Sequence, residues 1–343
     1  MQPILFYLPF VNIPVYGYGL MLFFAFIFCN LLARRLCKRE GIDGDLIPDL
    51  AIWFFVSGIV GGRVFFIFTK WHTEDGRGFD SRPWLEMVKL WDGGLVLYGA
   101  VFGGALGFFA YHYFVMRKHN VSIWKMFDVM APCVALGIAL GRIGCMFTGC
   151  CYGNVACESR PAITFPFHSP AWGEMVERSY QTPLGFLFKD DSLEVEAVEP
   201  DSPAASVLRP KDIIVEVNGK QPLRPSHVVP TDGVLKLTVN RDGQPVELPA
   251  FEPRSLGVNP TQPYETISMA LLMFFLLSYY PYKRHDGELL VFLMIGYSVH
   301  RYLNEMLRSD IDPGIFGLTL SQNISIVNFV LGWLAIAAVR LVH

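Results

Sequence analysis

An arginine and three cysteines in the middle of the chain have residue types and spacing that could do chemistry. Arg142 ends a long apolar run, and Cys145, Cys150 and Cys151 follow it within nine positions. A guanidinium at the edge of a bilayer is costly and is usually retained for a partner. Its planar fork suits a carboxylate or a phosphate, and the abundant phosphate of a membrane is a lipid head group. We therefore expect Arg142 to bind an anionic lipid; a snorkelling interfacial arginine is the alternative.

Membrane helices are expected to position these residues. The chain of 343 residues is 52% hydrophobic and 17% charged, whereas ordinary soluble domains are about 25% charged. A spanning helix needs about 20 mostly apolar residues, and seven runs qualify. They cover roughly 15–33, 47–69, 94–116, 123–147, 264–281, 288–307 and 316–340. The sequence thus predicts an all-α polytopic membrane protein of about seven transmembrane helices, the first of them retained because it lacks a signal-peptide pattern.

Basic residues predict the orientation of these helices. They cluster in alternate gaps, at 34–39, 117–125 and 283–285. By the positive-inside rule these gaps are cytoplasmic, so the N-terminus lies outside and the C-terminus inside. Segment 148–260 then falls on the outer face. Glycines at four-residue spacing, Gly99, Gly103 and Gly107 and the pair Gly137 and Gly141, predict close contacts between helix backbones.

A segment of different composition interrupts the membrane region. Residues 183–249 are richer in charge and alternate as strands do, in LEVEAVE and VLKLTVNR. The run GFLF (185–188) followed by EPDSPAASVLRPKDIIVEVNGK (199–220) resembles a PDZ domain, a module that binds peptides by strand addition. The stretch 221–233 is too rich in proline for the usual second helix. Peptide binding and a role that only rigidifies the outer face both stay open, and the predicted domains are 1–182, 183–249 and 250–343.

Four motifs are expected at the outer ends of the spans, together with one helix face in the sixth span. The motifs are YGYG (16–19), WDGGLVLYGAVFGG (91–104), GRIGCMFTGCCYG (141–153) and NPTQPYE (259–265). In the sixth span Tyr297, Arg301, Glu305 and Arg308 recur at helical spacing, which places them on one face. Arg308 itself is expected at the edge of the helix.

These motifs, in this order, resemble the prolipoprotein diacylglyceryl transferase family over most of the membrane region. The matching segments are YGLM (18–21), GGR (61–63), WDGG and YGAVFGG, DVMAP and GRIG (128–144), PTQPYE and GYSVHRYLNEMLR. The resemblance implies a transferase that moves the diacylglyceryl group of phosphatidylglycerol to the lipobox cysteine of an exported prolipoprotein and releases glycerol phosphate. It also implies a role in lipoprotein biosynthesis and an inner-membrane location with the active site facing the periplasm or the cell exterior.

The resemblance also implies site residues. Arg142 and Arg301 match the family's functional arginines, and such groups can hold a phosphodiester and stabilise the charge of a leaving phosphate. The residues expected to bind substrate are Tyr18, Arg63, Gly153, Glu265, Tyr297 and Glu305. For Arg301 the alternative is a structural ion pair with Glu305, four residues away. A closed ion pair with no room for a head group would count against the enzyme hypothesis.

The chain departs from the family at the expected catalytic base. Tyr98 stands where the family usually has histidine, and a tyrosine, with a pKa near 10, is a poor base unless arginines lower that pKa. We predict Tyr98 as the third catalytic residue; an aromatic-belt tyrosine is the alternative. Cys145, Cys150 and Asn259 replace the family's asparagine, glutamate and histidine. The Gly-Cys-Cys-Tyr-Gly sequence resembles a divergent subgroup.

Three interpretations of the cysteines stay open. Cys145, Cys150, Cys151 and Cys157 fall on the outer side, where disulfides form, so one or two bridges are the first interpretation. Metal binding is the second interpretation, because the C-x4-C-C-x5-C spacing matches no standard zinc pattern. We accordingly expect no metal, and we expect no cofactor. A nucleophilic thiol is third.

The net charge of −3 and the absence of a basic arm argue against a nucleic-acid partner. The expected partners are phosphatidylglycerol, exported prolipoproteins and membrane lipid, with the chain as a monomer. An altered relative that binds phospholipid or transfers it to another acceptor, with the insert as an interaction module, is the alternative. A transporter is disfavoured, because no inverted repeat is evident.

Overall fold

The computed structural model describes residues 4–7, 14–71, 87, 96–156, 161–167, 169–190, 192–230, 233–253, 255–308 and 317–342. The chain divides into two compact units. The first unit comprises Met1–Leu22, Leu140–Ser268 and His300–Ile324, and the second comprises Phe23–Ala139, Met269–Val299 and Ser325–His343. Each unit is therefore assembled from three separated segments of the sequence.

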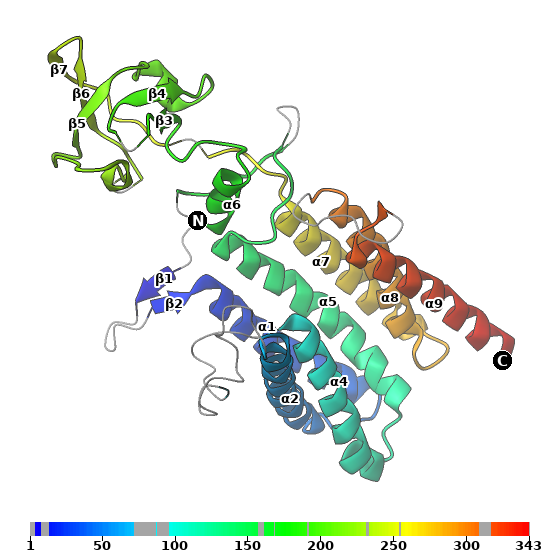
Figure 1. Ribbon diagram of the computed structural model, residues 1–343. Coiled ribbons are helices and arrows are strands. Elements are labelled where there is room, and N and C mark those ends of the chain that lie inside the picture. The colour runs from blue at the N-terminus through cyan, green and yellow to red at the C-terminus, as the bar shows by residue number, and fades with distance from the viewer. Residues whose placement is uncertain are drawn as a thin grey trace. The chain divides into compact units, whose positions relative to one another are not determined.

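A long helix forms at each of the seven apolar runs (Figure 1). These helices are α1 (Gly17–Arg39), α2 (Leu46–Thr69), α4 (Leu97–Phe114), α5 (Ile123–Thr148), α7 (Thr261–Tyr279), α8 (Glu288–Glu305) and α9 (Leu320–Val342). Among the described residues, α1, α2 and α5 are long and apolar enough to cross a membrane. Short 3₁₀ turns at Met116–His119 and Tyr280–Tyr282 follow α4 and α7.

In the second unit, α2 and α4 lie side by side at a contact made by glycines (Figure 1). A β-carbon on Gly61 would overlap the carbonyl oxygen of Gly99, and one on Gly103 would overlap the carbonyl oxygen of Ser57. This confirms the predicted close contact for Gly99, Gly103 and Gly107. For the pair in α5 the prediction was wrong. Among the described residues, a β-carbon on Gly141 would meet nothing within 4 Å, and one on Gly137 would meet only Cys29 Sγ at 3.7 Å.

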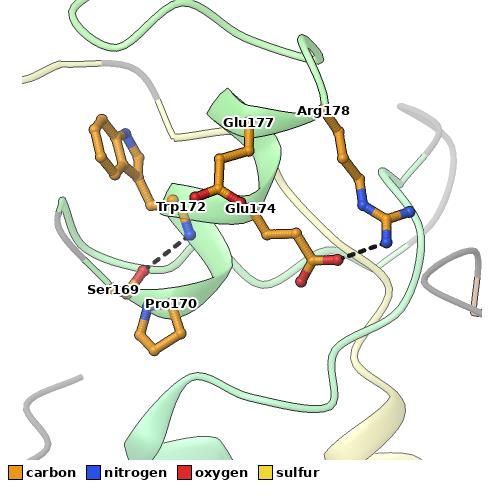
Figure 2. Close-up of a pocket in the computed structure, with 7 residues that line it drawn as sticks. Ser169, Pro170, Trp172, Glu174, Glu177 and Arg178 are labelled. Atoms are coloured by element: carbon orange, nitrogen blue, oxygen red, sulfur yellow. Dashed lines mark hydrogen bonds and ion pairs between the residues drawn. The ribbon is translucent and has the colours of Figure 1, made fainter. Parts of the chain in front are cut away.

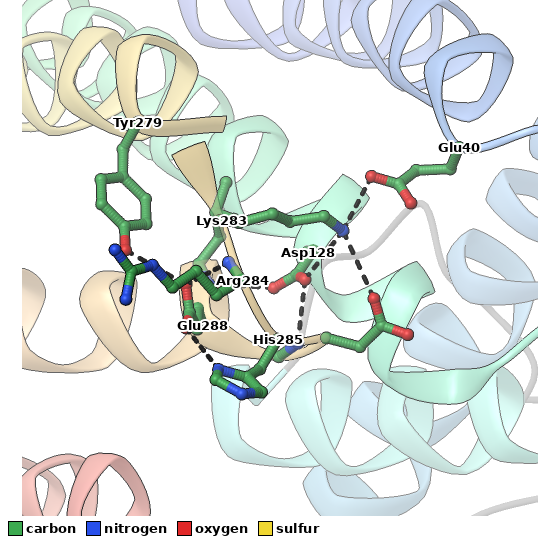
Figure 3. A network of polar contacts seen from close by, with 10 residues as sticks. Glu40, Asp128, Tyr279, Lys283, Arg284, His285 and Glu288 are labelled. Atoms are coloured by element: carbon green, nitrogen blue, oxygen red, sulfur yellow. Dashed lines mark hydrogen bonds and ion pairs between the residues drawn. The ribbon is translucent and has the colours of Figure 1, made fainter. Parts of the chain in front are cut away.

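A buried ionic network, the lysine cluster, lies in the second unit (Figure 3). Lys283 Nζ lies 2.7 Å from Glu40 Oε1, 3.2 Å from Asp128 Oδ2 and 3.6 Å from Asp286 Oδ1. Asp128 also accepts hydrogen bonds from the backbone N–H groups of Gly287 and Leu289, and it thus caps the first turn of α8. Burial alone would lower the pKa of Lys283, but hydrogen bonding to Glu40 and the charge of Asp128 raise it, so the lysine stays charged.

The insert in the first unit has its own apolar core. Strands β3 (Phe186–Phe188) and β4 (Val195–Val198) pair antiparallel, as do β5 (Ile213–Val217), β6 (Leu237–Arg241) and β7 (Gln244–Glu247) in the order β5-β6-β7. Buried side chains from Leu184 to Phe251 pack together between them. In 221–230 the described helical structure is a 3₁₀ turn, Pro225–His227, which agrees with the prediction from the prolines. Another 3₁₀ turn spans Pro203–Ser206.

Three further elements belong to the first unit. The antiparallel strands β1 (Ile4–Tyr7) and β2 (Pro14–Tyr16) precede α1, and the short helix α6 (Pro170–Glu177) follows the cysteine-rich segment. Ala171 and Met175 of α6 pack with Phe165 and Val258 in a small core. This core anchors the chain on both sides of the insert, because Phe165 precedes the insert and Val258 follows it.

Candidate active site

Arg142 and Glu265 form a buried ion pair in the first unit. Arg142 lies in α5 and its Nε is 2.9 Å from Glu265 Oε2 of α7. The glutamate side chain is 1% exposed and the arginine 18%. The sequence predicts a carboxylate or a phosphate as the partner of Arg142. Within the protein, that partner is the carboxylate of Glu265. The pair ties α5 to α7 across 123 positions of sequence.

The second predicted arginine is also paired. Arg301 Nη2 lies 2.8 Å from Glu305 Oε2, one helical turn further along α8, and donates a hydrogen bond to Ser321 Oγ at 2.9 Å. Thr319 Oγ1 donates to the other oxygen of Glu305 at 3.0 Å. The structure therefore contains the ion pair with Glu305 that the spacing suggested for Arg301, and the role of Arg301 stays a prediction. Both arginines have protein carboxylates as partners, which is the arrangement that would count against a lipid site if it were closed.

Asn304 and His300 join the two pairs into one network. Asn304 Nδ2 donates to Glu265 Oε2 at 3.1 Å, and His300 Nε2 lies 3.9 Å from the same oxygen. Neither residue was predicted, although His300 and Asn304 are four apart on α8 and that spacing could have revealed them. We call this network the arginine cluster, and its members are Arg142, Glu265, His300, Arg301, Asn304 and Glu305.

The arginine cluster is not closed by its own contacts. Within the described residues, five of its buried polar atoms have no hydrogen-bond partner. They are Glu265 Oε1, His300 Nε2, Arg301 Nη1, Asn304 Oδ1 and Glu305 Oε2, the last of which lies in the ion pair with Arg301. Buried polar groups in proteins are nearly always hydrogen-bonded, so such a concentration needs an explanation. The set contains a charged donor and carbonyl-type acceptors, which are the groups that a phosphate and a hydroxyl would bind.

The cysteine-rich segment lies beside this cluster. The sulfur atoms of Cys145, Cys150 and Cys151 are all within 4.8 Å of one another, and the three are free thiols. Hydrogen bonding from the Cys145 and Cys150 thiols lowers the pKa of Cys151, and the guanidinium groups of Arg142 and Arg308 lower it further. Cys157 lies outside the described residues, so disulfides that involve it stay a prediction.

Two other predicted residues support the same region by packing. Tyr18 of α1 lies against Gly144, where an added β-carbon would approach its ring within 2.9 Å. Gly153 is enclosed more tightly, since a β-carbon there would meet the carbonyl oxygen of Leu307 at 2.6 Å and that of Asn259 at 2.9 Å. The N–H of Gly153 donates to Asn259 at 3.0 Å. Gly153 thus lets the segment after the cysteines run close to the ends of α7 and α8.

Three predicted residues belong to the second unit. Arg63 of α2 is buried and donates through Nε to the carbonyl oxygen of Met87 at 2.8 Å. Tyr98 lies in the first turn of α4 and is 61% exposed. Tyr297 of α8 is partly buried. Their roles in chemistry stay predictions.

An open pocket beside α6 has a different lining (Figure 2). Its volume is about 560 Å³, and its walls include Ser169, Trp172, Glu174, Glu177 and Arg178. Ser169 caps α6 by accepting the N–H of Trp172, and Arg178 pairs with Glu174 at 2.9 Å. None of the residues predicted for chemistry lines it.

Comparison with known proteins identifies similar chains. The family model described as prolipoprotein diacylglyceryl transferase matches residues 3–338. A phosphatidylglycerol–prolipoprotein diacylglyceryl transferase of Rhodopirellula baltica is 31% identical over 364 aligned positions, which cover 92% of this chain and 70% of that protein. The protein of the same name from Clostridium tetani is 26% identical and covers 97% of this chain and 95% of its own length. That of Synechococcus elongatus is 34% identical over 40% of this chain and 44% of its own.

Proposed function

Because the chain belongs to the prolipoprotein diacylglyceryl transferase family, we propose that it transfers the diacylglyceryl group of phosphatidylglycerol to the lipobox cysteine of an exported prolipoprotein. The relatives are transferases, and their names give phosphatidylglycerol and prolipoprotein as the substrates. The second product is glycerol phosphate. The transfer joins the cysteine sulfur to a glyceryl carbon and breaks the bond between that carbon and a phosphate oxygen.

The observation that carries this proposal is the set of unpartnered atoms in the arginine cluster. The phosphatidylglycerol head group is a phosphodiester that bears a glycerol with hydroxyl groups. Arg301 Nη1 can donate to a phosphate oxygen, and Glu265 Oε1 and Asn304 Oδ1 can accept from hydroxyls. These are complementary groups, and they are buried, which strengthens each electrostatic contact.

We assign roles to the cluster from this complementarity. Arg142 and Arg301 stabilise the charge that develops on the leaving phosphate, as preorganised donors do. Glu265 and Glu305 hold the two guanidinium groups in place through the ion pairs at 2.9 and 2.8 Å. Tyr18 and Gly153 shape the surroundings by packing. Tyr98 as the base, and Arg63 and Tyr297 as substrate ligands, remain part of the proposal on the strength of their motifs.

The proposal includes the setting of the enzyme. The proposed enzyme has seven spans in a bacterial inner membrane. The basic gaps at 34–39, 117–125 and 283–285 then place the N-terminus outside and the arginine cluster at the outer face. The insert, 183–249, is then a PDZ-like domain on the outer face. The chain has the domains 1–182, 183–249 and 250–343, and it belongs to a divergent subgroup of the family. The separate apolar core of the insert supports an independent module. The enzyme acts as a monomer without nucleic acid.

A second candidate function is phospholipid binding, or transfer of lipid to another acceptor, without prolipoprotein modification. The observation that favours it is that both arginines already have carboxylate partners. A protein of this kind would bind phosphatidylglycerol and release no glycerol phosphate in the presence of a lipobox peptide.

Purified protein in detergent, supplied with phosphatidylglycerol and a lipobox peptide, tests the choice. We expect glycerol phosphate to be released and the peptide to gain the mass of a diacylglyceryl group. Arg142→Ala should reduce that release by about 100-fold or more, because a charged donor to the phosphate is lost. Arg178→Ala removes a half-exposed arginine paired with Glu174 and is the matched control. Full turnover by Arg142→Ala would refute the assignment, and lipid binding without product would favour the second candidate.

A further inference from the structure

The three thiols at the end of α5 converge on one point. Cys145 lies within the last turn of α5, and Cys150 and Cys151 lie in the segment that follows. Their sulfur atoms are all within 4.8 Å of one another, and all three side chains are partly buried. In a tetrahedral zinc site with Zn–S bonds of about 2.3 Å, neighbouring sulfurs are about 3.8 Å apart. Shifts of an ångström or less in the side chains would therefore complete such a site.

The backbone holds this arrangement without help from a sulfur–sulfur bond. The chain reverses after α5 through two left-handed residues, Gly149 at φ +75° and Cys151 at φ +59°. A left-handed cysteine costs roughly 1–3 kcal/mol and persists only where its surroundings fix it. Here Thr261 Oγ1 donates to the carbonyl of Cys151 at 2.7 Å, and Gln262 Nε2 donates to that of Cys150 at 2.8 Å. Two side chains of α7 thus fix the conformation that brings the thiols together.

We propose that Cys145, Cys150 and Cys151 bind one soft, thiophilic metal ion, of the class of Zn²⁺, through three thiolates. Soft thiolate ligands select zinc or copper(I) over hard cations such as Mg²⁺ and Ca²⁺. This revises the expectation of no metal that the spacing of the cysteines suggested. The linear spacing matches no standard zinc pattern, but the folded loop gathers the ligands that the pattern does not reveal.

The charges around the loop are those that such a site needs. Three thiolates and one divalent ion together carry one net negative charge. The guanidinium groups of Arg142 and Arg308 both act electrostatically on Cys151. They therefore stabilise the complex as a whole, in the way that cations outside a metal site balance an excess of anionic ligands.

Three protein ligands leave a fourth coordination position, which is the arrangement of catalytic rather than structural zinc sites. A role for this fourth position in catalysis rests on the proposed function, in which the acceptor group is a cysteine thiol. At the fourth position the acceptor cysteine would bind as a thiolate and release its proton to water, so on this route Tyr98 would not be needed as the base. Its sulfur then forms the bond to the glyceryl carbon, and the carbon–oxygen bond breaks with its electron pair staying on the phosphate.

Metal binding is tested on the full chain in detergent, reduced and freed of metal with a chelator. We expect titration with Cd²⁺ to give an ultraviolet cadmium–thiolate charge-transfer band that saturates at one ion per chain. Zn²⁺ should abolish the band by competition. In the unsubstituted protein, Zn²⁺ should also protect Cys145, Cys150 and Cys151 from alkylation, as read by peptide mass mapping. This last measurement does not depend on whether a variant folds.

Variants separate the three thiols from the other cysteines. Cys145→Ser, Cys150→Ser and Cys151→Ser should each weaken Cd²⁺ binding by more than about 100-fold. Loss of a residue that only hydrogen-bonds to a metal ligand already lowers metal affinity by about 10–100-fold. Cys29→Ser and Cys133→Ser are the matched controls, since those two thiols contact each other's backbone in the second unit. The site would be overturned if no charge-transfer band formed, or if the three serine variants bound Cd²⁺ as tightly as the unsubstituted protein. A disulfide joining two of these cysteines in protein purified without reductant would also overturn it.

The fourth position has its own readout, independent of turnover. A lipobox peptide should raise the intensity of the Cd²⁺ band, because a fourth thiolate adds to it, and the same peptide with serine for cysteine should not. An unchanged band would overturn the thiol-binding step and leave a purely structural metal. Loss of the metal with full release of glycerol phosphate would refute the catalytic role while the proposed transferase function stands.

Discussion

The lysine cluster and the arginine cluster are built from the same kinds of charged groups, but they differ in how completely their hydrogen bonds are made. In the lysine cluster, one ammonium meets Glu40, Asp128 and Asp286, and Asp128 is completed by two backbone N–H groups (Figure 3). Within the described residues, no buried atom of these four side chains lacks a partner. In the described part of the chain, the arginine cluster instead leaves five buried polar atoms without a hydrogen-bond partner.

The difference separates a contact made for the fold from one made for a ligand. Burying a charge is costly, and the fold recovers that cost only when every remaining donor and acceptor is also satisfied. The lysine cluster meets this condition with protein groups alone. The arginine cluster meets it only if something else supplies the missing partners. We therefore expect substitutions in the first network to change stability and substitutions in the second to change turnover.

Lys283→Met should give the largest effect, and the effect should be on stability. Removal of the ammonium leaves Asp128, whose side chain is fully buried, without its cation. Breaking a buried pair from one side costs about 3–5 kcal/mol. We expect a clear drop in the midpoint of thermal unfolding in detergent, with turnover per folded molecule unchanged.

The matched control for Lys283→Met is Arg34→Met in the same unit. Arg34 pairs with Asp45 at 2.6 Å, but both side chains are exposed, and such pairs are worth about 0–1 kcal/mol. If the two variants melted alike, the lysine cluster would have no special structural role and the comparison would fail.

Arg301→Lys should give the next largest effect, and that effect should be on turnover. Lysine keeps a positive charge for Glu305 but lacks the planar fork, so the donor at the position of Nη1 is lost. Loss of one preorganised donor costs about 100–1000-fold in rate. The measurement is the rate of glycerol phosphate release, with Arg178→Lys as the control.

An Arg301→Lys protein with normal turnover would mean that the unpartnered atoms serve no ligand. A protein that failed to fold would mean that the arginine cluster is structural, as the lysine cluster is. Either result would remove the contrast between the two networks.

Long apolar runs made the helices predictable. Seven runs of about 20 residues gave seven helices, because in such runs hydrophobicity and length dominate all other signals. In the insert, the alternation in LEVEAVE and VLKLTVNR marked β4 and β6. The spacing of glycines did not distinguish α4, where it marks a helix contact, from α5, where it does not. A helix pattern records which residues share a face and not which faces meet.

The site was predictable residue by residue and not as a network. Arg142, Glu265, Arg301 and Glu305 were all identified from the motifs. The pairing of Arg142 with Glu265 links residues 123 positions apart, and no local period carries such information. The convergence of the three thiols also escaped the linear pattern, because it depends on left-handed backbone at Gly149 and Cys151. Cysteine is rarely found in that conformation, so the sequence gives no reason to expect it.

Gly153→Ala should give a smaller effect that reaches the arginine cluster through its support. The added β-carbon would meet backbone oxygens of Leu307 and Asn259 at 2.6 and 2.9 Å, and backbone cannot move aside cheaply. Overpacking of this kind costs about 1–3 kcal/mol. We expect a lower melting midpoint together with slower turnover, because Leu307 lies just beyond α8, which carries Arg301.

Gly141→Ala is the matched control, since it adds the same methyl group next to Arg142. In the part of the chain that the structure describes, a β-carbon there meets nothing within 4 Å, and alanine favours a helix over glycine by about 1 kcal/mol. The control should melt no lower than the unsubstituted protein. Equal effects from the two variants would show that the added methyl group itself, and not the close contact at Gly153, decides the result.

The smallest expected effect concerns a third buried pair, which resembles the lysine cluster in being satisfied. In the insert, Arg241 donates through Nε and Nη2 to the two oxygens of Asp212 at 2.8 and 2.6 Å. Burial alone would raise the pKa of Asp212, but the hydrogen bonds from Arg241 and from the N–H of Arg209 bring it below its usual value. A carboxyl group whose pKa falls on folding stabilises the fold above its unfolded pKa of about 3.9.

That stabilisation is lost as the pH falls through the lowered pKa, because the proton then binds in the folded state as well. Hydrogen–deuterium exchange over β5 and β6, corrected for the intrinsic effect of pH, should therefore show the strands opening below about pH 4. Asp212→Asn should already be open at neutral pH and should lose this acid dependence. Glu194→Gln, in a partly exposed pair with Lys189, should keep it. An Asp212→Asn protein with unchanged exchange would show that a satisfied buried pair need not stabilise its surroundings. The structural role assigned to the lysine cluster would then rest on Lys283→Met alone.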